Sequence, residues 1–109
     1  MNKKILQLPK NPTLHTFQVY VKKVTKERGF EKETIPELFM LFLEECGEMA
    51  KAARKIQNIK SDQNSKDYNI AEEVADVFMY LLEICNKHNI DLEKAFREKE
   101  KVNKKRVWK

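Results

Sequence analysis

The sequence has few of the residues that make tight turns or covalent cross-links. Its 109 residues include two glycines, three prolines and two cysteines. Glycine and proline are too scarce for the many turns of an all-β sandwich or barrel, and two cysteines do not form a disulfide framework. No apolar run approaches the roughly 20 residues of a membrane span, and the first residues contain no apolar stretch long enough for a secretory signal. These absences predict a mostly helical cytoplasmic domain with no membrane partner.

Charge is abundant but unevenly distributed along the chain. Lysine and arginine number 22 against 17 acidic residues, a net charge of +5. The segment 97–109 alone holds seven basic and two acidic side chains, so the rest of the chain is near neutral. A basic segment suits nucleic acid and polyphosphate equally well. Charge therefore leaves open a basic helical module that binds nucleic acid or regulates a partner without catalysis.

Apolar residues recur at helical spacing in four segments, after a loose arm over residues 1–12. We expect a single domain over 13–109, an all-α four-helix bundle with the two long middle helices at its centre. A polar loop at 59–68 separates these two helices. The predicted helices run from Leu14 to about Arg28, from Thr34 to Ile56 or Asn58, from Asn69 to about Asn86, and from Asp91 past Val102.

Two pairs of acidic residues stand on the two long helices. Glu45 and Glu48 are three residues apart on the first of them, and Glu73 and Asp76 are three apart on the second. Each pair shares one side of its helix, next to the apolar face, and is expected to line the edge of the core. Three other glutamates point away from that edge and are expected to be ordinary surface charges: Glu44, Glu72 and Glu83.

Four carboxylates that converge at the edge of a core repel one another unless some are protonated or a cation lies among them. Oxygen ligands without a nearby set of histidines and cysteines favour Mg²⁺ or Mn²⁺ over zinc. A metal held there would bind phosphates in turn. Acidic pairs at this spacing are also common on solvated helix faces, so a plain surface is the competing interpretation.

Three motifs resemble those of the MazG-like nucleoside triphosphate pyrophosphohydrolases. The sequence EECGE at 44–48 resembles the EExxE motif of that family, and EEVADVFMYLL at 72–82 resembles its ExxD helix. Lys99, Asn103 and Arg106 resemble its C-terminal K-x3-N-x2-R pattern, with positions i, i+4 and i+7 on one helical face. The family includes dCTP pyrophosphatases and dimeric dUTPases, and the resemblance extends over nearly the whole chain.

The resemblance implies a helical fold that assembles as a homodimer or homotetramer. It implies Mg²⁺-dependent hydrolysis of a ribo- or deoxyribonucleoside triphosphate to the monophosphate and pyrophosphate, in a house-cleaning role for nucleotide pools. By position, the metal ligands would be Glu45, Glu48, Glu73 and Asp76, with Glu45 or Glu48 also orienting the attacking water. Substrate contacts would come from Tyr80 beside the nucleotide and from Lys99, Asn103 and Arg106 of the same or a neighbouring subunit.

The remaining candidates concern phosphate and base. Lys55 follows the first acidic pair on the same helix, where it either contacts phosphate or belongs to a solvated face. The single tryptophan lies near the terminus, so the base would be bound by other aromatic residues: Phe17, Tyr20, Phe30 or Tyr80. The nucleic-acid alternative is disfavoured because no helix-turn-helix spacing is found and the acidic pairs would repel phosphate without a metal.

Overall fold

The computed structural model describes residues 5–57 and 69–108, and the statements below concern these residues. They form four α-helices and one 3₁₀ turn, and no strand occurs among them. The predicted all-α fold is therefore confirmed, while the predicted loop at 59–68 lies outside the described residues. The elements are α1 (Leu14–Glu27), η1 (Phe30–Lys32), α2 (Ile35–Ile56), α3 (Ile70–Lys87) and α4 (Leu92–Lys104).

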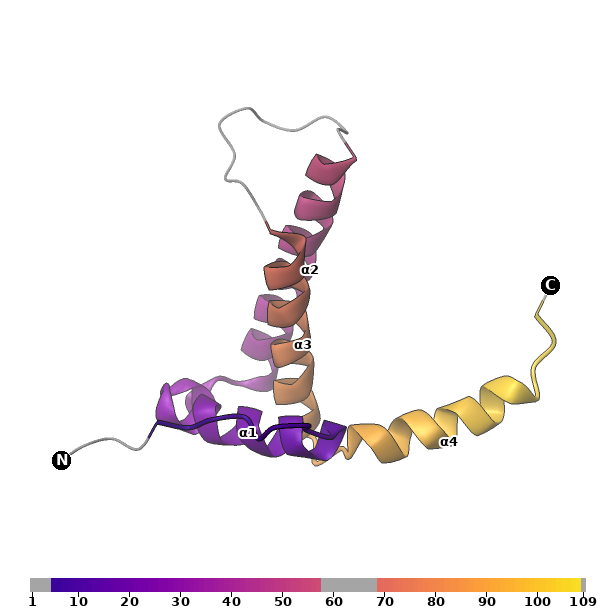
Figure 1. Cartoon of the computed structure of the whole chain (residues 1–109), viewed down its shortest axis with the longest axis horizontal. Coiled ribbons are helices and arrows are strands. Elements are labelled where there is room, and N and C mark those ends of the chain that lie inside the picture. Colours follow the sequence, from indigo (N-terminus) through magenta and orange to yellow (C-terminus); the bar gives the residue numbers. More distant parts are fainter. Residues whose placement is uncertain (1–4, 58–68, 109) are drawn as a thin grey trace.

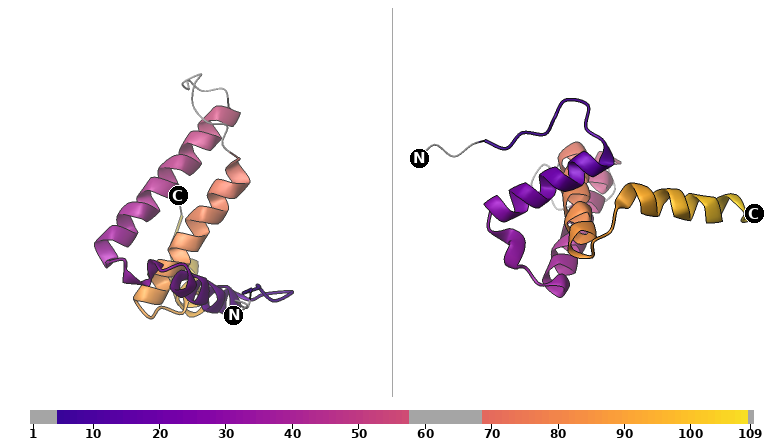
Figure 2. Two further views of the ribbon diagram at one scale, coloured as in Figure 1. Left: turned by 90° about the vertical axis from the view of Figure 1, so that its left-hand side faces the viewer. Right: turned by 90° about the horizontal axis from the view of Figure 1, so that it is seen from below.

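The two longest helices, α2 and α3, pack as an antiparallel hairpin, and α1 crosses α3 at the end of the hairpin where α2 begins and α3 ends (Figures 1 and 2). This arrangement confirms the expectation that the middle helices are central. No helix among the described residues has both the length and the apolar character that crossing a membrane requires.

The helices begin where polar capping residues predict. Thr34 and Glu37 form a reciprocal capping box at the start of α2, and Pro36 occupies its first turn. The side chains of Thr13, Asn69 and Asp91 accept backbone hydrogen bonds at the starts of the other three α-helices. Gly29 ends α1 with a φ of 78°, a left-handed conformation that glycine adopts without steric cost. These local sequence signals thus set where the four α-helices begin and where α1 ends.

The buried core is small and lies between α3 and the two helices that pack on it, α1 and α2. Leu38 of α2 and Leu82 of α3 are fully buried, and Phe17 packs edge-on against Phe78 with 5.6 Å between ring centroids. The other buried apolar residues are Val21, Val24, Ala52, Ile84 and Cys85. Phe17, one of the aromatic residues considered as a contact for the nucleotide base, is thus part of the packed interface between α1 and α3.

A buried glutamine joins α1 to the turn between α3 and α4. The side-chain amide nitrogen of Gln18 donates to the carbonyl oxygen of Ile90 at 2.7 Å and to Oδ1 of Asn86 at 3.2 Å. Its Oε1 accepts from the backbone nitrogen of Leu92 at 2.9 Å, and Asn86 Nδ2 donates to the Gln18 carbonyl at 3.0 Å. Gln18 therefore ties α1 to the first residue of α4 and fixes where α4 starts.

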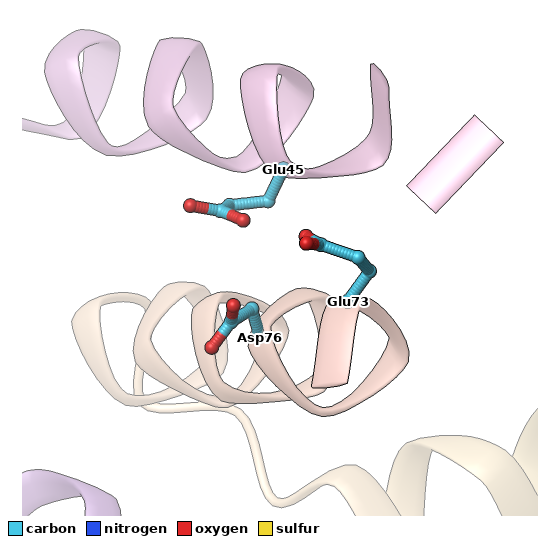
Figure 3. A group of neighbouring side chains, drawn as sticks. All are labelled: Glu45, Glu73 and Asp76. Carbon is cyan, nitrogen blue, oxygen red and sulfur yellow. The ribbon is translucent and has the colours of Figure 1, made fainter. Parts of the chain in front are cut away.

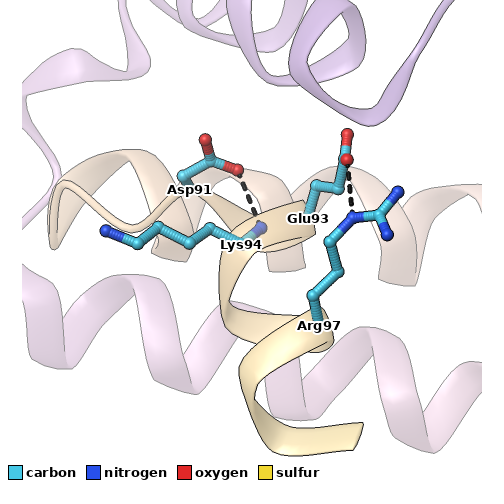
Figure 4. Close-up of polar contacts among 4 residues, drawn as sticks. All are labelled: Asp91, Glu93, Lys94 and Arg97. Atoms are coloured by element: carbon cyan, nitrogen blue, oxygen red, sulfur yellow. Dashed lines mark hydrogen bonds and ion pairs between the residues drawn. The ribbon is translucent and has the colours of Figure 1, made fainter. Parts of the chain in front are cut away.

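Helix α4 leaves the foot of the hairpin and projects away from it (Figure 1). Asp91 caps it by accepting from the Lys94 backbone nitrogen at 3.1 Å, and Arg97 pairs with Glu93 at 2.9 Å (Figure 4). Its apolar residue Phe96 is 65% exposed, because α4 packs mainly against the start of α1. The radius of gyration is 17.1 Å, against about 13 Å for a compact domain of this length.

Candidate metal centre

Three carboxylates from the two hairpin helices converge on one point. Glu45 extends from α2 toward Glu73 and Asp76 on α3, and one oxygen of each lies within 4.8 Å of the others (Figure 3). Among the described residues this is the one group of three or more potential ligands so arranged. Three of the four predicted metal ligands are therefore brought together by the fold.

The local structure explains the convergence. Glu73 and Asp76 are one turn apart on α3 and share a face of it. Glu73 stands in the first turn of α3, where the helix dipole favours negative charge. Antiparallel packing of α2 on α3 then brings Glu45 opposite this pair. The spacing of the acids and the pairing of the helices are together sufficient to build the cluster.

Two oxygens of this acid cluster are buried without a hydrogen-bond partner. These are Oε2 of Glu45 and Oε2 of Glu73, and the Glu73 residue as a whole is 8% exposed. Buried polar atoms in folded proteins almost always have a partner, because leaving one unpaired costs about 1–3 kcal/mol. The two oxygens therefore form a site where a positively charged group would supply both with a partner.

The electrostatics agree with that conclusion. Burial, followed by the charges of Glu48 and Asp76, raises the pKa of Glu45 to about 7. Burial also raises the pKa of Glu73, with further contributions from the charge of Glu48 and a hydrogen bond with it. Glu48 lies outside the close group of three, yet it interacts with both glutamates. Four acidic side chains thus share one partly dehydrated region.

The residues present fit a hard divalent cation. Every candidate ligand is a carboxylate oxygen, which suits Mg²⁺ or Mn²⁺ better than zinc or copper. A cation would supply partners for both orphaned oxygens and offset the burial and the repulsion that together raise the pKa values of Glu45 and Glu73.

The structure places the predicted substrate-binding residues in two regions. Tyr80 lies on α3, one turn after Asp76, and burial raises the pKa of its hydroxyl with additional effects from nearby carboxylates. Lys55 is half-buried near the end of α2. Both belong to the hairpin that carries the acid cluster.

The predicted phosphate-binding residues of the tail lie elsewhere. Lys99 and Asn103 are in α4, and Arg106 follows its end and stacks on Trp108 with 4.8 Å to the ring centroid. Because α4 projects from the foot of the hairpin, one chain does not bring this tail to its own acid cluster (Figures 1 and 2).

One glutamate differs from its sequence-based interpretation. Glu83 was expected to be a surface charge, but it is half-buried, and burial raises its pKa. Its Oε1 accepts a hydrogen bond from the Thr25 hydroxyl of α1 at 3.3 Å. The available signal was its position seven residues after Asp76, on the same face of α3, but the covering helix α1 could not be placed from sequence.

Comparison with known families is consistent with the site. The family model described as the MazG nucleotide pyrophosphohydrolase domain matches residues 33–107, which include α2, α3 and α4 and all four acids. No curated protein and no solved structure matches the chain. The match covers well over half of the sequence and includes the acid cluster that the fold assembles. The chain therefore belongs to the MazG nucleotide pyrophosphohydrolase family.

Proposed function

We propose that the acid cluster binds Mg²⁺, with Mn²⁺ as a substitute, and that the protein hydrolyses a nucleoside triphosphate to the monophosphate and pyrophosphate. The observation that carries the proposal is the convergence of Glu45, Glu73 and Asp76 with two buried, unpartnered oxygens. Membership of a family of nucleotide pyrophosphohydrolases supports the reaction class.

The metal ligands in this proposal are Glu45, Glu48, Glu73 and Asp76. When bound, a divalent ion there neutralises phosphate charge and acidifies a coordinated water. Glu48, beside the close group of three and hydrogen-bonded within it, would share this task with a second ion or hold a water. Tyr80, one turn further along α3, lies beside the sugar or base.

The reaction itself needs one proton acceptor and one departing group. The oxygen of a water molecule attacks the α-phosphorus, and Glu45 or Glu48 takes its proton as general base. The bond between the α-phosphorus and the oxygen bridging to the β-phosphorus breaks. That oxygen leaves with pyrophosphate, and the attacking oxygen stays on the monophosphate. The cluster's fixed position on two packed helices supplies the orientation this displacement requires.

The proposal includes a second copy of the chain, in a homodimer or homotetramer. Helix α4 holds the basic tail away from its own acid cluster, and the charges of tail and cluster are opposite. Apolar residues are exposed on α2 and α4, including Met40, Leu43 and Phe96 at 70, 65 and 65%. We infer that α4 packs on a neighbouring subunit, where Lys99, Asn103 and Arg106 contact the phosphates or sugar of the nucleotide.

A matched pair of variants tests the proposed function. Glu73→Gln removes one ligand charge with little change of shape, and Glu44→Gln makes the same change at an exposed position of α2. Pyrophosphate release with Mg²⁺ is expected to fall more than about 100-fold in Glu73→Gln and to stay near wild type in Glu44→Gln. Undiminished release by a folded Glu73→Gln protein would contradict the proposal.

A further inference from the structure

A second feature of the surface lies where α1 crosses α3. A cavity of about 280 Å³ opens there beside η1, and we call it the α1/α3 cavity. Acidic, basic and neutral polar side chains all line this cavity. Those used below are Lys22, Thr25 and Lys26 of α1 with Glu83, Asn86 and Lys87 of α3.

The cavity and the acid cluster lie along one face of α3. Asp76, Tyr80 and Glu83 follow one another at intervals of four and three residues, so their side chains share a face. Seven residues separate Asp76 from Glu83, about 10 Å along the helix axis. Burial raises the pKa of the Tyr80 hydroxyl, and the charges of Glu83, Glu33, Glu45 and Asp76 add to the rise, so this hydroxyl lies near carboxylates of both the cavity and the acid cluster. A nucleotide whose phosphates lie at the acid cluster can therefore extend past Tyr80 to the cavity.

The polar groups in the cavity are held in place. Thr25 donates its hydroxyl hydrogen to Glu83 at 3.3 Å, and the Lys87 ammonium donates to the Glu31 carbonyl oxygen at 2.8 Å. The Asn86 side chain is hydrogen-bonded to Gln18: its Oδ1 accepts from Gln18 Nε2 at 3.2 Å, and its Nδ2 donates to the Gln18 carbonyl oxygen at 3.0 Å. Asn86 is thus a wall of the cavity, and the Glu83 carboxylate is its positioned acceptor.

The neighbouring lysines give the cavity positively charged groups beside the Glu83 carboxyl. Lys22 and Lys26 are exposed at the cavity and offer donors only, whereas an ionised carboxylate offers acceptors only. Burial, with the charge of Glu33, raises the pKa of the Glu83 carboxyl, while the hydrogen bond from Thr25 and the charges of Lys87 and Arg28 oppose that rise. A ligand that matches this pattern presents an amino group to Glu83 and a carbonyl or ring nitrogen to a lysine.

We propose that the α1/α3 cavity receives the base of the nucleotide, and that Glu83 selects bases carrying an exocyclic amino group over uracil and thymine. The inference rests on the proposed function, because the phosphates at the acid cluster set the direction in which the base points. Cytosine offers an amino group where uracil has a carbonyl oxygen. A uracil oxygen facing the Glu83 carboxylate leaves two acceptors opposed and unpaired, which a site built for hydrogen bonding rejects strongly.

Relative turnover of CTP and UTP tests this inference. The wild-type protein with Mg²⁺ is expected to favour CTP in kcat/KM by about tenfold or more. Glu83→Gln keeps the shape and still accepts from Thr25, but its amide can also donate to a uracil carbonyl. We expect the ratio to fall about tenfold in this variant, through gain on UTP and loss on CTP. The control Glu44→Gln, which does not line the cavity, is expected to keep the wild-type ratio.

A Thr25→Val substitution tests the role of Glu83 in base selection by a second, independent change. It removes the hydrogen bond that positions Glu83 and leaves the carboxylate itself, so the CTP preference is expected to weaken by a few-fold with little change in UTP turnover. This variant also serves if Glu83→Gln does not fold.

The outcomes separate the inference from the function on which it rests. No hydrolysis of either triphosphate by folded wild-type protein with Mg²⁺ overturns the proposed function, and the inference with it. Hydrolysis of both with equal kcat/KM overturns the inference alone. So does a CTP preference that Glu83→Gln and Thr25→Val both leave unchanged.

Discussion

At the scale of single residues, the acid cluster works against folding when no cation is present. Glu45 and Glu73 each place an oxygen in a buried position with no partner, next to other carboxylates. Residues retained in such positions cost stability unless a ligand compensates. This cost in stability predicts two measurable properties of the protein.

The first is a stability that falls as pH rises. The pKa of Glu45 is about 7 in the folded chain against an ordinary value of 4.5, so the folded state favours the protonated form. Its contribution is fully present below pH 4.5 and is lost as pH rises through 7. The shift of Glu73 has the same direction. In chelator, the unfolding temperature is expected to decrease as the pH is raised from 5 to 8. The decrease is expected to be smaller in Glu45→Gln. A midpoint that rises over this range in chelator would contradict this explanation.

The second property is stabilisation by metal. Mg²⁺ that binds only the folded protein stabilises it by about 2.7 kcal/mol at 100 times its dissociation constant. The gain in unfolding temperature is expected to be larger at pH 8 than at pH 5, because protons compete for the carboxylates. Asp76→Asn should lose most of this gain while keeping its fold. An equal Mg²⁺ effect on Asp76→Asn and wild type would place the binding elsewhere.

The sequence predicted the position of these acids better than the roles of two other polar residues. Spacing alone paired Glu45 with Glu48 and Glu73 with Asp76 at the edge of the core, and three of these four acids form the close group in the structure. No role was predicted for Gln18, and the prediction that Glu83 is a surface charge was wrong, because both roles depend on the helix that packs against each residue. Helical spacing predicts which residues share a face, but not which polar residue another element will cover.

At the scale of elements, α1 and α4 are held by one side chain. Gln18 satisfies the Ile90 carbonyl and the Leu92 backbone nitrogen at the turn into α4. Gln18→Ala leaves both without their partner and is expected to lower the free energy of unfolding by about 1–3 kcal/mol. Amide exchange in the first turn of α4 should also accelerate. Urea unfolding and hydrogen exchange measure the two effects.

The same change at an exposed glutamine provides the comparison. Gln57 follows the end of α2 and is exposed, so Gln57→Ala is expected to change stability by less than about 0.5 kcal/mol. Equal effects of the two substitutions would contradict the role assigned to Gln18.

Helix boundaries were largely predictable, whereas the path of α4 was not. Capping residues such as Thr34 and Asp91 act within a few residues of themselves, so their sequence signal is local and strong. The short η1 carries too few residues for a periodic pattern and was not predicted. The apolar face of α4 predicted packing, but Phe96 stays exposed in the single chain. A sequence indicates that a helix has an apolar face that will be buried. It does not indicate whether the same chain or another chain covers that face.

At the scale of the whole molecule, one chain leaves its apolar and basic surfaces uncovered. The hairpin and the projecting α4 give a radius of gyration well above that of a compact domain. Apolar residues are exposed on both, and the tail charge is opposite to that of the acid cluster. We expect these surfaces to meet between subunits.

Mixing two inactive variants tests that arrangement. Glu48→Gln impairs the acid cluster, and the double substitution Lys99→Ala with Arg106→Ala impairs the tail. If each site combines the cluster of one subunit with the tail of another, a randomly mixed twofold dimer regains about a quarter of wild-type activity. Unmixed samples should stay inactive. Failure to regain activity, with subunit exchange shown by mass-tagged chains, would contradict a shared site.

The most direct test of the central claim is product analysis with the unaltered protein. Each common ribo- and deoxyribonucleoside triphosphate is incubated with and without Mg²⁺, and the products are separated. We expect at least one triphosphate to yield monophosphate and pyrophosphate in equal amounts, and chelator to abolish the reaction. Absence of turnover for every triphosphate, or release of orthophosphate and diphosphate instead, would contradict the account of the acid cluster as a pyrophosphohydrolase centre.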